Sequence, residues 1–371
     1  MMLKFLQFFN AMIHSILSSK EKNKTNSKGD DVMFTLKNSI TCIDTHTGGE
    51  PTRIVIGGFP SIPGKTIPEK CGYVNEHFDN LRSMMMLEPR GHSDMYGTIL
   101  TPPVTEDGDY GVLFPNNDSL SPMCGHATIG VATAVIETGM MPAEPGINVV
   151  KLDSPAGRVT AYAQVNEKGS VDYVKFHNVP CFIYKKDIEI EVDGYGTIHG
   201  DIVYGGCFYA YVDAEQFGID IIPENVSKLT EIGVAVKKAA EKKYSIQHPT
   251  EIGVNWLYGT MLLAPVRRED NKVYAKNICI FADGEVDRSP TGTASGGRVA
   301  QLYERGILGK EDILINRGVL DSEFECRVVE ETAVGEYSAI VPEIKGNAYI
   351  TGFNQLVLDP RDPFPHGFRL L

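Results

Sequence analysis

Two segments far apart in the chain follow the same pattern, and this repeat restricts the fold more than any other feature. The first, residues 121–139, reads Ser-Pro-Met-Cys-Gly-His-Ala-Thr-Ile-Gly-Val-Ala-Thr-Ala-Val-Ile-Glu-Thr-Gly, and the second, residues 289–306, reads Ser-Pro-Thr-Gly-Thr-Ala-Ser-Gly-Gly-Arg-Val-Ala-Gln-Leu-Tyr-Glu-Arg-Gly. Aligning Cys124 with Thr291 brings glycines, an alanine and a glutamate into register. Each segment predicts a helix that begins after a thiol or hydroxyl and ends before glycine. The repeat therefore predicts two α+β domains facing one another across a cleft.

Weaker patterns surround the repeat. Strand-like runs occur in both halves of the chain, and apolar residues at helical spacing predict further helices over 68–86 and 224–243. A polar loop is expected at 282–290, between a strand and the second repeat helix.

The charge and cysteine content narrow the function. With 371 residues and a formal net charge of −13, the chain is a poor match for a nucleic acid or an anionic membrane surface. Seven scattered cysteines argue against a disulfide framework and favour a reducing compartment. We therefore expect a cytoplasmic protein with no nucleic-acid or membrane partner.

Residues 1–33 differ from the rest of the chain. An apolar run over residues 1–17 is followed by a polar, lysine-rich linker, and the run is short for a membrane span. Two interpretations stay open: a disordered or weakly helical extension, or a segment that directs secretion or organelle targeting through residues 1–20.

The starts of the two repeat helices predict a site for a small carboxylate. A helix N-terminus carries unpaired N–H groups and a partial positive charge, and Gly125 and Gly292 allow a ligand to approach that backbone. Cys124 at such a position would have its thiolate favoured, with His126 adding to the effect. The alternative for Cys124 is a buried, inert thiol.

Motifs for metals and nucleotides are not found in the sequence. It has no C-x-x-C, no H-E-x-x-H, no EF-hand loop, and no G-x-G-x-x-G between a strand and a helix. We therefore expect no cofactor and no metal.

Several motifs together resemble the proline racemase family. They are Met123-Cys124-Gly125-His126, Asp287-Arg288-Ser289-Pro290-Thr291-Gly292-Thr293, Asp44-Thr45-His46-Thr47-Gly48-Gly49-Glu50, Met86-Leu87-Glu88-Pro89-Arg90-Gly91-His92, Tyr204-Gly205-Gly206 and Gly352-Phe353-Asn354. The resemblance implies the two-domain α+β fold shared with diaminopimelate epimerase, with the active site in the interdomain cleft. The last strands of this fold return to the first domain. The expected organisation is an extension over 1–33, a first domain over 34–158 plus 337–371, and a second domain over 159–336.

One departure from the family pattern directs the functional prediction. Racemases of the family use two cysteines, one on each face of the substrate α-carbon, whereas this chain has Cys124 and Thr291. A hydroxyl is too weakly acidic to replace the second thiol. Members with threonine at this position resemble trans-3-hydroxy-L-proline dehydratases. The implied activity is that of a hydro-lyase that needs no cofactor.

The resemblance also implies roles for the other site residues. Backbone N–H groups of Gly125, His126, Gly292 and Thr293 would bind the carboxylate, His126 and Asp287 would bind the ring nitrogen, and Phe281 and Tyr96 would form walls. Other roles stay open for four of these positions: a helix-surface side chain for His126, a turn-former for Asp287, a core residue for Tyr96 and a helix N-cap for Thr291. The expected partner is a proline-like imino acid, and the family implies a homodimer.

Two further functions remain as alternatives. One is a proline racemase or hydroxyproline 2-epimerase that works with a single cysteine and a water. The other is a non-catalytic relative that binds carboxylates, although the intact Cys124-Gly125-His126 sequence argues against a mere binder.

Overall fold

The computed structural model describes residues 38–251 and 254–370, so the predicted extension at 1–33, with its targeting alternative, lies outside the described residues. Five α-helices and two 3-10 turns occur in this part of the chain. They are α2 (Ile67–His77), α3 (Asp79–Met86), α4 (Gly125–Glu137), α5 (Val226–Lys243), α6 (Gly292–Glu304), η1 (Ala214–Phe217) and η2 (Pro223–Asn225).

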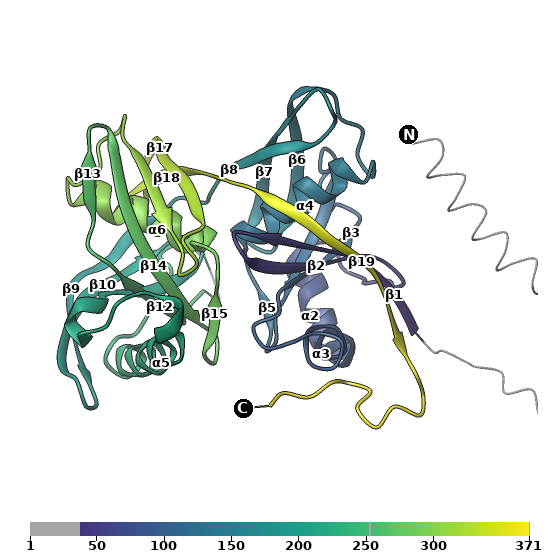
Figure 1. The fold of residues 1–371 in the computed structure, drawn as a ribbon, viewed down its shortest axis with the longest axis horizontal. Coiled ribbons are helices and arrows are strands. Elements are labelled where there is room, and N and C mark those ends of the chain that lie inside the picture. The colour runs from purple at the N-terminus through teal and green to yellow at the C-terminus, as the bar shows by residue number, and fades with distance from the viewer. Residues whose placement is uncertain (1–37, 252–253, 371) are drawn as a thin grey trace, which may run out of the picture. The chain divides into compact units, whose positions relative to one another are not determined.

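The first half of the fold is a sheet of hydrogen-bonded strands that surrounds α4 (Figure 1). In spatial order these strands are β19 (Ala348–Leu358), β1 (Asn38–Thr47), β2 (Glu50–Gly57), β3 (Gly97–Thr101), β4 (Tyr110–Pro115), β6 (Gly146–Ser154), β7 (Gly157–Val165) and β8 (Val171–His177), with the short β5 (Leu120–Ser121) on β4. Only the pairs β2–β3 and β4–β6 are parallel. Because strands enclose it, α4 is buried along almost its whole length.

The second half repeats this order around α6. Its strands are β9 (Phe182–Val192), β10 (Gly196–Tyr204), β11 (Phe208–Asp213), β12 (Leu257–Leu263), β14 (Lys272–Phe281), β16 (Ile313–Arg317), β17 (Glu323–Val334) and β18 (Tyr337–Gly346), with the short β13 (Arg267–Glu269) and β15 (Glu285–Asp287) on β14. The parallel pairs, β11–β12 and β14–β16, stand at the same two places in the order. The two halves therefore share one topology.

The repeat in the sequence accounts for this symmetry. The helices α4 and α6 each have 13 residues and begin at the aligned glycines, Gly125 and Gly292. Each is followed by a glycine in the left-handed region, Gly139 at φ +72° and Gly306 at φ +69°, which ends the helix. The predicted repeat helices, and the prediction of two α+β halves, are confirmed.

The two halves are joined where β8 pairs with β18. As the resemblance implied, the chain ends by returning to the first half, where β19 lies antiparallel to β1 (Figure 1). We propose that the domain boundaries lie between β8 and β9 and between β18 and β19. The boundaries predicted from the sequence, after residues 158 and 336, would instead separate β7 and β8 from the sheet around α4, and β18 from the sheet around α6.

Two local predictions need correction. The helix predicted over 68–86 is interrupted at Phe78, which leaves helical geometry at φ −131° and packs its ring edge-on against Phe59 and Tyr73. The loop predicted over 282–290 contains β15, which pairs with β14 so that Asp287 lies opposite Cys279. This pairing fixes Asp287 on a strand rather than in a free loop.

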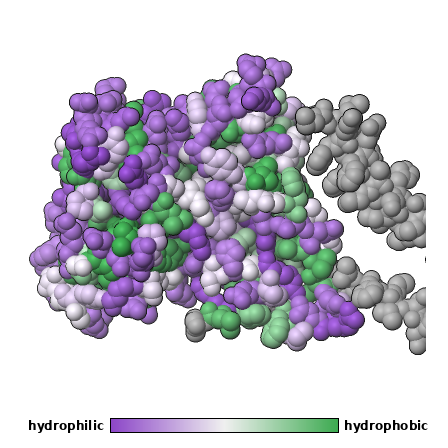
Figure 2. Space-filling model, viewed as in Figure 1, coloured by the Kyte–Doolittle hydropathy of each residue, from purple (hydrophilic) through white to green (hydrophobic). Residues whose placement is uncertain are grey.

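Apolar side chains form buried clusters in the interior of the fold. The largest apolar cluster runs through both halves and includes Phe114, Phe176, Tyr209 and Phe324. On the face shown in Figure 2, hydrophilic and hydrophobic residues are interspersed.

No helix in the described part of the chain has the length and apolar character needed to cross a membrane. All seven cysteines are described, and each is a free thiol.

Two helix-interior glycines should respond to alanine in opposite ways. A Cβ at Gly233, in α5, would lie 2.6 Å from side-chain atoms of Ile280, whereas a Cβ at the exposed Gly72, in α2, would meet nothing within 4 Å. Gly233→Ala should therefore destabilise the fold by about 1–3 kcal/mol, because overpacking outweighs the gain in helix propensity. Gly72→Ala should stabilise it by about 0.5–1 kcal/mol. Urea denaturation of the two variants would measure both changes, and equal effects would contradict the packing described here.

Candidate active site

The starts of α4 and α6 meet at two glycines. A Cβ on Gly125 would lie 2.6 Å from the Gly292 Cα atom, and a Cβ on Gly292 would lie 2.5 Å from the Gly125 Cα atom. Real Cβ atoms do not approach backbone this closely, so glycine is required at both positions. The first N–H groups of both helices, which have no acceptor within their own helix, thus come together in one place.

One cavity beside this contact gathers every residue that the sequence singled out. Its walls include Tyr96, Cys124, Gly125, His126, Phe281, Asp287, Thr291, Gly292 and Thr293. Four further residues line it: Met123, Tyr209, Tyr258 and Cys279. No role was predicted for these four. Three of them, Tyr209, Tyr258 and Cys279, lie within mostly buried strands whose apolar runs do not reveal which side chains face the site.

The cavity is small and enclosed by buried groups. Its volume is about 20 Å³, which is room for a single water molecule. A cyclic imino acid is several times larger, so the cavity would have to widen to hold one.

Cys124 occupies the N-cap position of α4. Its Sγ atom accepts a hydrogen bond from the Ala127 N–H at 3.4 Å and lies 3.2 Å from His126 Nδ1. Burial raises the pKa of the Cys124 thiol well above its ordinary value; the Ala127 N–H opposes the shift, and the negative charge of Asp287 adds to it. Loss of hydration therefore opposes the thiolate that the helix start is expected to favour.

His126 lies between Cys124 and Asp287. Its Nδ1 atom is 4.0 Å from Asp287 Oδ2, and both side chains are buried. Burial lowers the pKa of His126, with the charge of Asp287 opposing the shift, so the imidazole is neutral near pH 7. A neutral imidazole within reach of a thiol can accept the thiol proton.

Asp287 is held from the second half. Its Oδ1 atom accepts hydrogen bonds from the Ser289 N–H at 2.8 Å and the Ser289 hydroxyl at 2.7 Å. These bonds occupy one carboxylate oxygen and leave Oδ2 toward His126. Asp287 is thus a positioned carboxylate at the cavity wall.

Thr291 stands at the N-cap of α6 but does not cap it. Its backbone has φ +65°, which is rare for a β-branched residue, and its hydroxyl makes no cap hydrogen bond. The buried Oγ1 atom has no hydrogen-bond partner among the described residues. The N-cap role predicted as an alternative is wrong, because this backbone conformation does not bring the hydroxyl to the first turn. Strain and an unpaired hydroxyl in a cavity are typical of functional positions.

Aromatic rings form the remaining wall. Tyr96 packs edge-on against His126 with ring centroids 4.8 Å apart, and Tyr258 stacks on Phe281 at 5.5 Å. The Tyr258 hydroxyl lies 2.7 Å from Ser121 Oγ, so this ring links the second half to the segment before α4. Burial, then the charge of Cys124, raises the pKa of Tyr96 well above its ordinary value, which keeps its hydroxyl a neutral donor.

A buried carboxyl also connects the halves beside the cavity. Glu50 is 0% exposed, and its Oε2 atom accepts hydrogen bonds from the Arg288 N–H at 2.8 Å and Nη1 at 3.4 Å. Burial, then the charge of Asp287, raises the pKa of Glu50 well above its ordinary value. Asp94 also reaches across, with Oδ1 accepting from the Val286 N–H at 3.1 Å. These bonds join the two halves beside the cavity.

A metal centre finds no support in the described residues. Within 38–251 and 254–370, no group of three or more His, Cys, Asp or Glu side chains is arranged to bind a metal ion.

Comparison with known proteins agrees with this geometry. The family model described as proline racemase matches residues 42–369. A trans-3-hydroxy-L-proline dehydratase from Bacillus thuringiensis subsp. konkukian (strain 97-27) is 45% identical over 89% of this chain and 98% of its own length. A 3-hydroxyproline 2-epimerase from Burkholderia multivorans is 42% identical over 90% of this chain and 98% of its own length.

A solved structure shows the same fold. The crystal structure of a hydroxyproline epimerase from Agrobacterium vitis, with bound trans-4-hydroxy-L-proline, matches with a TM-score of 0.83 and 31% identity, covering 90% of this chain and 96% of that chain. The fold implied by the family resemblance is thereby confirmed. From the sequence match, the shared fold and the cavity at the paired helix starts, this chain belongs to the proline racemase family.

Proposed function

We propose that this protein removes water from trans-3-hydroxy-L-proline to give pyrroline-2-carboxylate. The observation that carries the proposal is the pair of residues at the helix starts, a thiol at Cys124 and a hydroxyl at Thr291, around one cavity. A relative with the dehydratase name at 45% identity supports it. The reaction is that of a hydro-lyase, and enzymes of this family need no cofactor.

The stereochemistry of the substrate suits a single base. In trans-3-hydroxy-L-proline the carboxylate and the hydroxyl lie on opposite ring faces, so the α-hydrogen and the hydroxyl share a face. One group on that face can take the α-proton and return it to the departing oxygen. A second thiol on the other face, as in a racemase, is then unnecessary.

The elimination balances with Cys124 alone as proton carrier. The Cys124 thiolate takes the α-proton, and the electrons of the C–H bond form the double bond between C2 and C3. The C3–O bond breaks with its electron pair, and the departing oxygen takes the proton from Cys124 to leave as water. The enamine then tautomerises to the cyclic imine.

Binding of the substrate would prepare Cys124 for this step. The N–H groups of Gly125, His126, Gly292 and Thr293 would hold the carboxylate, and His126 and Asp287 would hold the ring nitrogen. A protonated ring nitrogen beside Asp287 offsets part of the negative charge that raises the pKa of Cys124. The substrate thus favours the thiolate that the reaction needs.

A 3-hydroxyproline 2-epimerase is the second candidate. A relative at 42% identity has that name, and a second thiol, Cys279, lines the same cavity. Burial, then the charge of Asp287, raises the pKa of Cys279 well above its ordinary value, so its thiol is a candidate proton donor. The predicted homodimer and cytoplasmic location stay predictions.

Loss of the Cys124 thiol should abolish dehydration. Cys124→Ser should lower kcat by about 10²–10⁴-fold, the usual contribution of a general acid–base group, while Cys71→Ser, at a cysteine outside the cavity, should change little. The cyclic imine can be detected with an amine reagent during incubation with trans-3-hydroxy-L-proline. An unchanged rate in Cys124→Ser would end the proposed mechanism. If the native protein forms only the D-epimer, the second candidate is favoured. Loss of that epimer in Cys279→Ser would then identify Cys279 as the second proton carrier.

Thr291→Cys should create two-base chemistry. A thiol at this helix start provides a proton donor that the hydroxyl lacks, so epimerisation at C2 should appear at the expense of dehydration. Chiral analysis of L-proline and trans-4-hydroxy-L-proline incubations, with deuterium uptake at C2 in D₂O, measures the change. Thr291→Ser is the matched control and should give no epimer. Unchanged chemistry in Thr291→Cys would show that other cavity residues decide the outcome.

Removing the charge of Asp287 should change the pKa of Cys124 measurably. Because this negative charge contributes to the raised pKa of Cys124, Asp287→Asn should lower that pKa and speed alkylation of the thiol at a fixed pH below it. A fall of about one pKa unit corresponds to about tenfold faster alkylation. Iodoacetamide labelling followed by mass spectrometry of the Cys124 peptide gives the rate. The exposed Asp283→Asn is the control, and equal effects of both variants would contradict the electrostatic account.

A further inference from the structure

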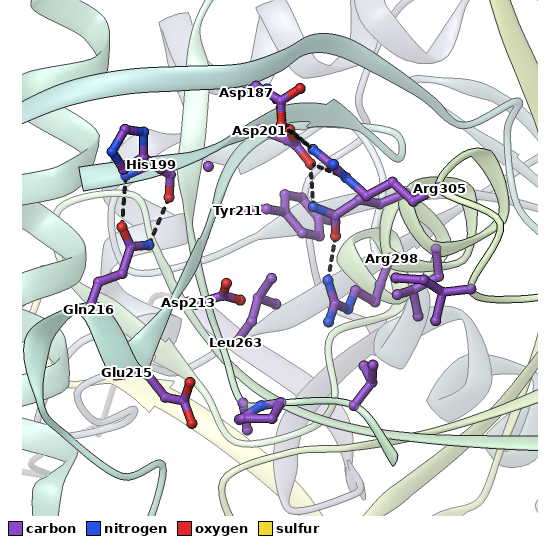
Figure 3. A pocket seen from close by; sticks show the side chains of 17 residues that line it. Asp187, His199, Asp201, Tyr211, Asp213, Glu215, Gln216, Leu263, Arg298 and Arg305 are labelled. Carbon is purple, nitrogen blue, oxygen red and sulfur yellow. Dashed lines mark hydrogen bonds and ion pairs between the residues drawn. The ribbon is translucent and has the colours of Figure 1, made fainter. Parts of the chain in front are cut away.

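A second cavity lies in the second half, away from the helix starts. Its volume is about 640 Å³, and it is formed by β10, β11, the end of β12 and the second part of α6 (Figure 3). None of its lining residues belongs to the candidate active site. Apolar contact surface comes from Leu263, Pro265 and Leu302.

Arg298 gives this cavity a buried cation without a counter-ion. The residue is 7% exposed, its Nη1 donates to Gln301 Oε1 at 2.5 Å, and its Nε has no hydrogen-bond partner among the described residues. No described carboxylate lies within ion-pair distance, 4.0 Å, of its guanidinium group. Burial lowers the pKa of Arg298 to about 10, and Asp213 is the largest opposing influence. A guanidinium that is buried, with no carboxylate in range, is unfavourable unless an anion binds it.

The fold itself does not require a cation at this place. The alignment of Cys124 with Thr291 puts Arg298 at the position of Val131 in α4. Val131 is fully buried and apolar, in a helix surrounded by the same arrangement of strands. Packing around α6 would therefore accept an aliphatic residue, and the charge of Arg298 calls for another explanation.

The other charges of the cavity fall into two groups. Arg305 binds Asp201 and Asp187 through Nη2, at 2.6 Å and 2.9 Å, so this arginine and these two acids satisfy one another. Asp213 and Glu215 are exposed and form no ion pair with any described residue. Figure 3 shows the Arg298 guanidinium and the Asp213 carboxylate on opposite sides of Leu263.

We propose that this cavity is a second small-molecule site, for the zwitterion of an aliphatic α-amino acid. Its carboxylate would bind the free edge of Arg298, its ammonium group would face Asp213 and Glu215, and its side chain would pack on Leu263 and Leu302. The lining charges are Asp187, Asp201, Asp213 and Glu215 against Arg298 and Arg305, a net charge of −2. This balance disfavours a simple anion, whereas a zwitterion satisfies both unpaired groups.

The test uses L-leucine and two compounds that each lack one of its charges. Isothermal titration of the full chain should show saturable binding of L-leucine. 4-Methylpentanoate lacks the ammonium group and isoamylamine lacks the carboxylate, so each should bind at least about tenfold more weakly. Arg298→Met and Asp213→Asn should each weaken L-leucine binding about tenfold or more. Arg317→Met, at a partly exposed arginine of β16, and Asp287→Asn, in the proposed active site, should leave L-leucine binding unchanged, which separates the two sites.

Three results would overturn the proposal. They are no saturable binding of L-leucine to the native chain, equal binding of 4-methylpentanoate, and unchanged L-leucine affinity in Asp213→Asn. Asp213 is exposed, so this last variant keeps the test decisive even if Arg298→Met fails to fold.

Discussion

The contact between Gly125 and Gly292 is the constraint on which the rest of the structure depends. Two helix N-termini that meet head to head bring two partial positive charges together, which is unfavourable unless negative groups surround them. Asp287 lies beside this contact, and a substrate carboxylate would add a second negative group. The same contact explains why the enclosed cavity is small: nothing larger than glycine separates the helices. A bound carboxylate would therefore stabilise the meeting of the helix starts.

Burial determines the protonation states in the closed site. Cys124, Glu50 and Asp287 would place three negative charges within one buried cluster, and the pKa values of Cys124 and Glu50 are raised, first by burial and partly by the charge of Asp287. A helix start alone therefore does not produce a thiolate here. Arg288 lies against Glu50, with Nη1 3.4 Å from Oε2, and a protonated ring nitrogen would supply a further positive charge beside Asp287 and Cys124. This dependence would keep Cys124 unreactive until a substrate of the right charge is bound.

The sequence predicted the elements whose pattern is local. The repeat placed α4 and α6 and their terminal glycines, and the motifs placed nine residues that the structure brings to one cavity. The sequence could not predict Tyr209, Tyr258 or Cys279, because the parts of their strands that reach the cavity are mostly buried on both faces. It also missed the positive φ of Thr291 and the break at Phe78, since both depend on contacts with distant parts of the chain.

The shared topology of the halves makes their differences informative. Side chains required by packing should be similar at matched positions, as Ala127 and Ala294 are, both buried against their sheets. Several matched positions depart from this rule in chemistry rather than in size alone, among them Cys124 against Thr291 and Val131 against Arg298. The first pair lies at the cavity where one base suffices for a syn elimination but not for racemisation. The second pair has an aliphatic side chain in one half and a buried, unpaired cation in the other. The surrounding strands follow the same order in both halves, so the topology requires neither difference, and the two proposed ligands would account for them.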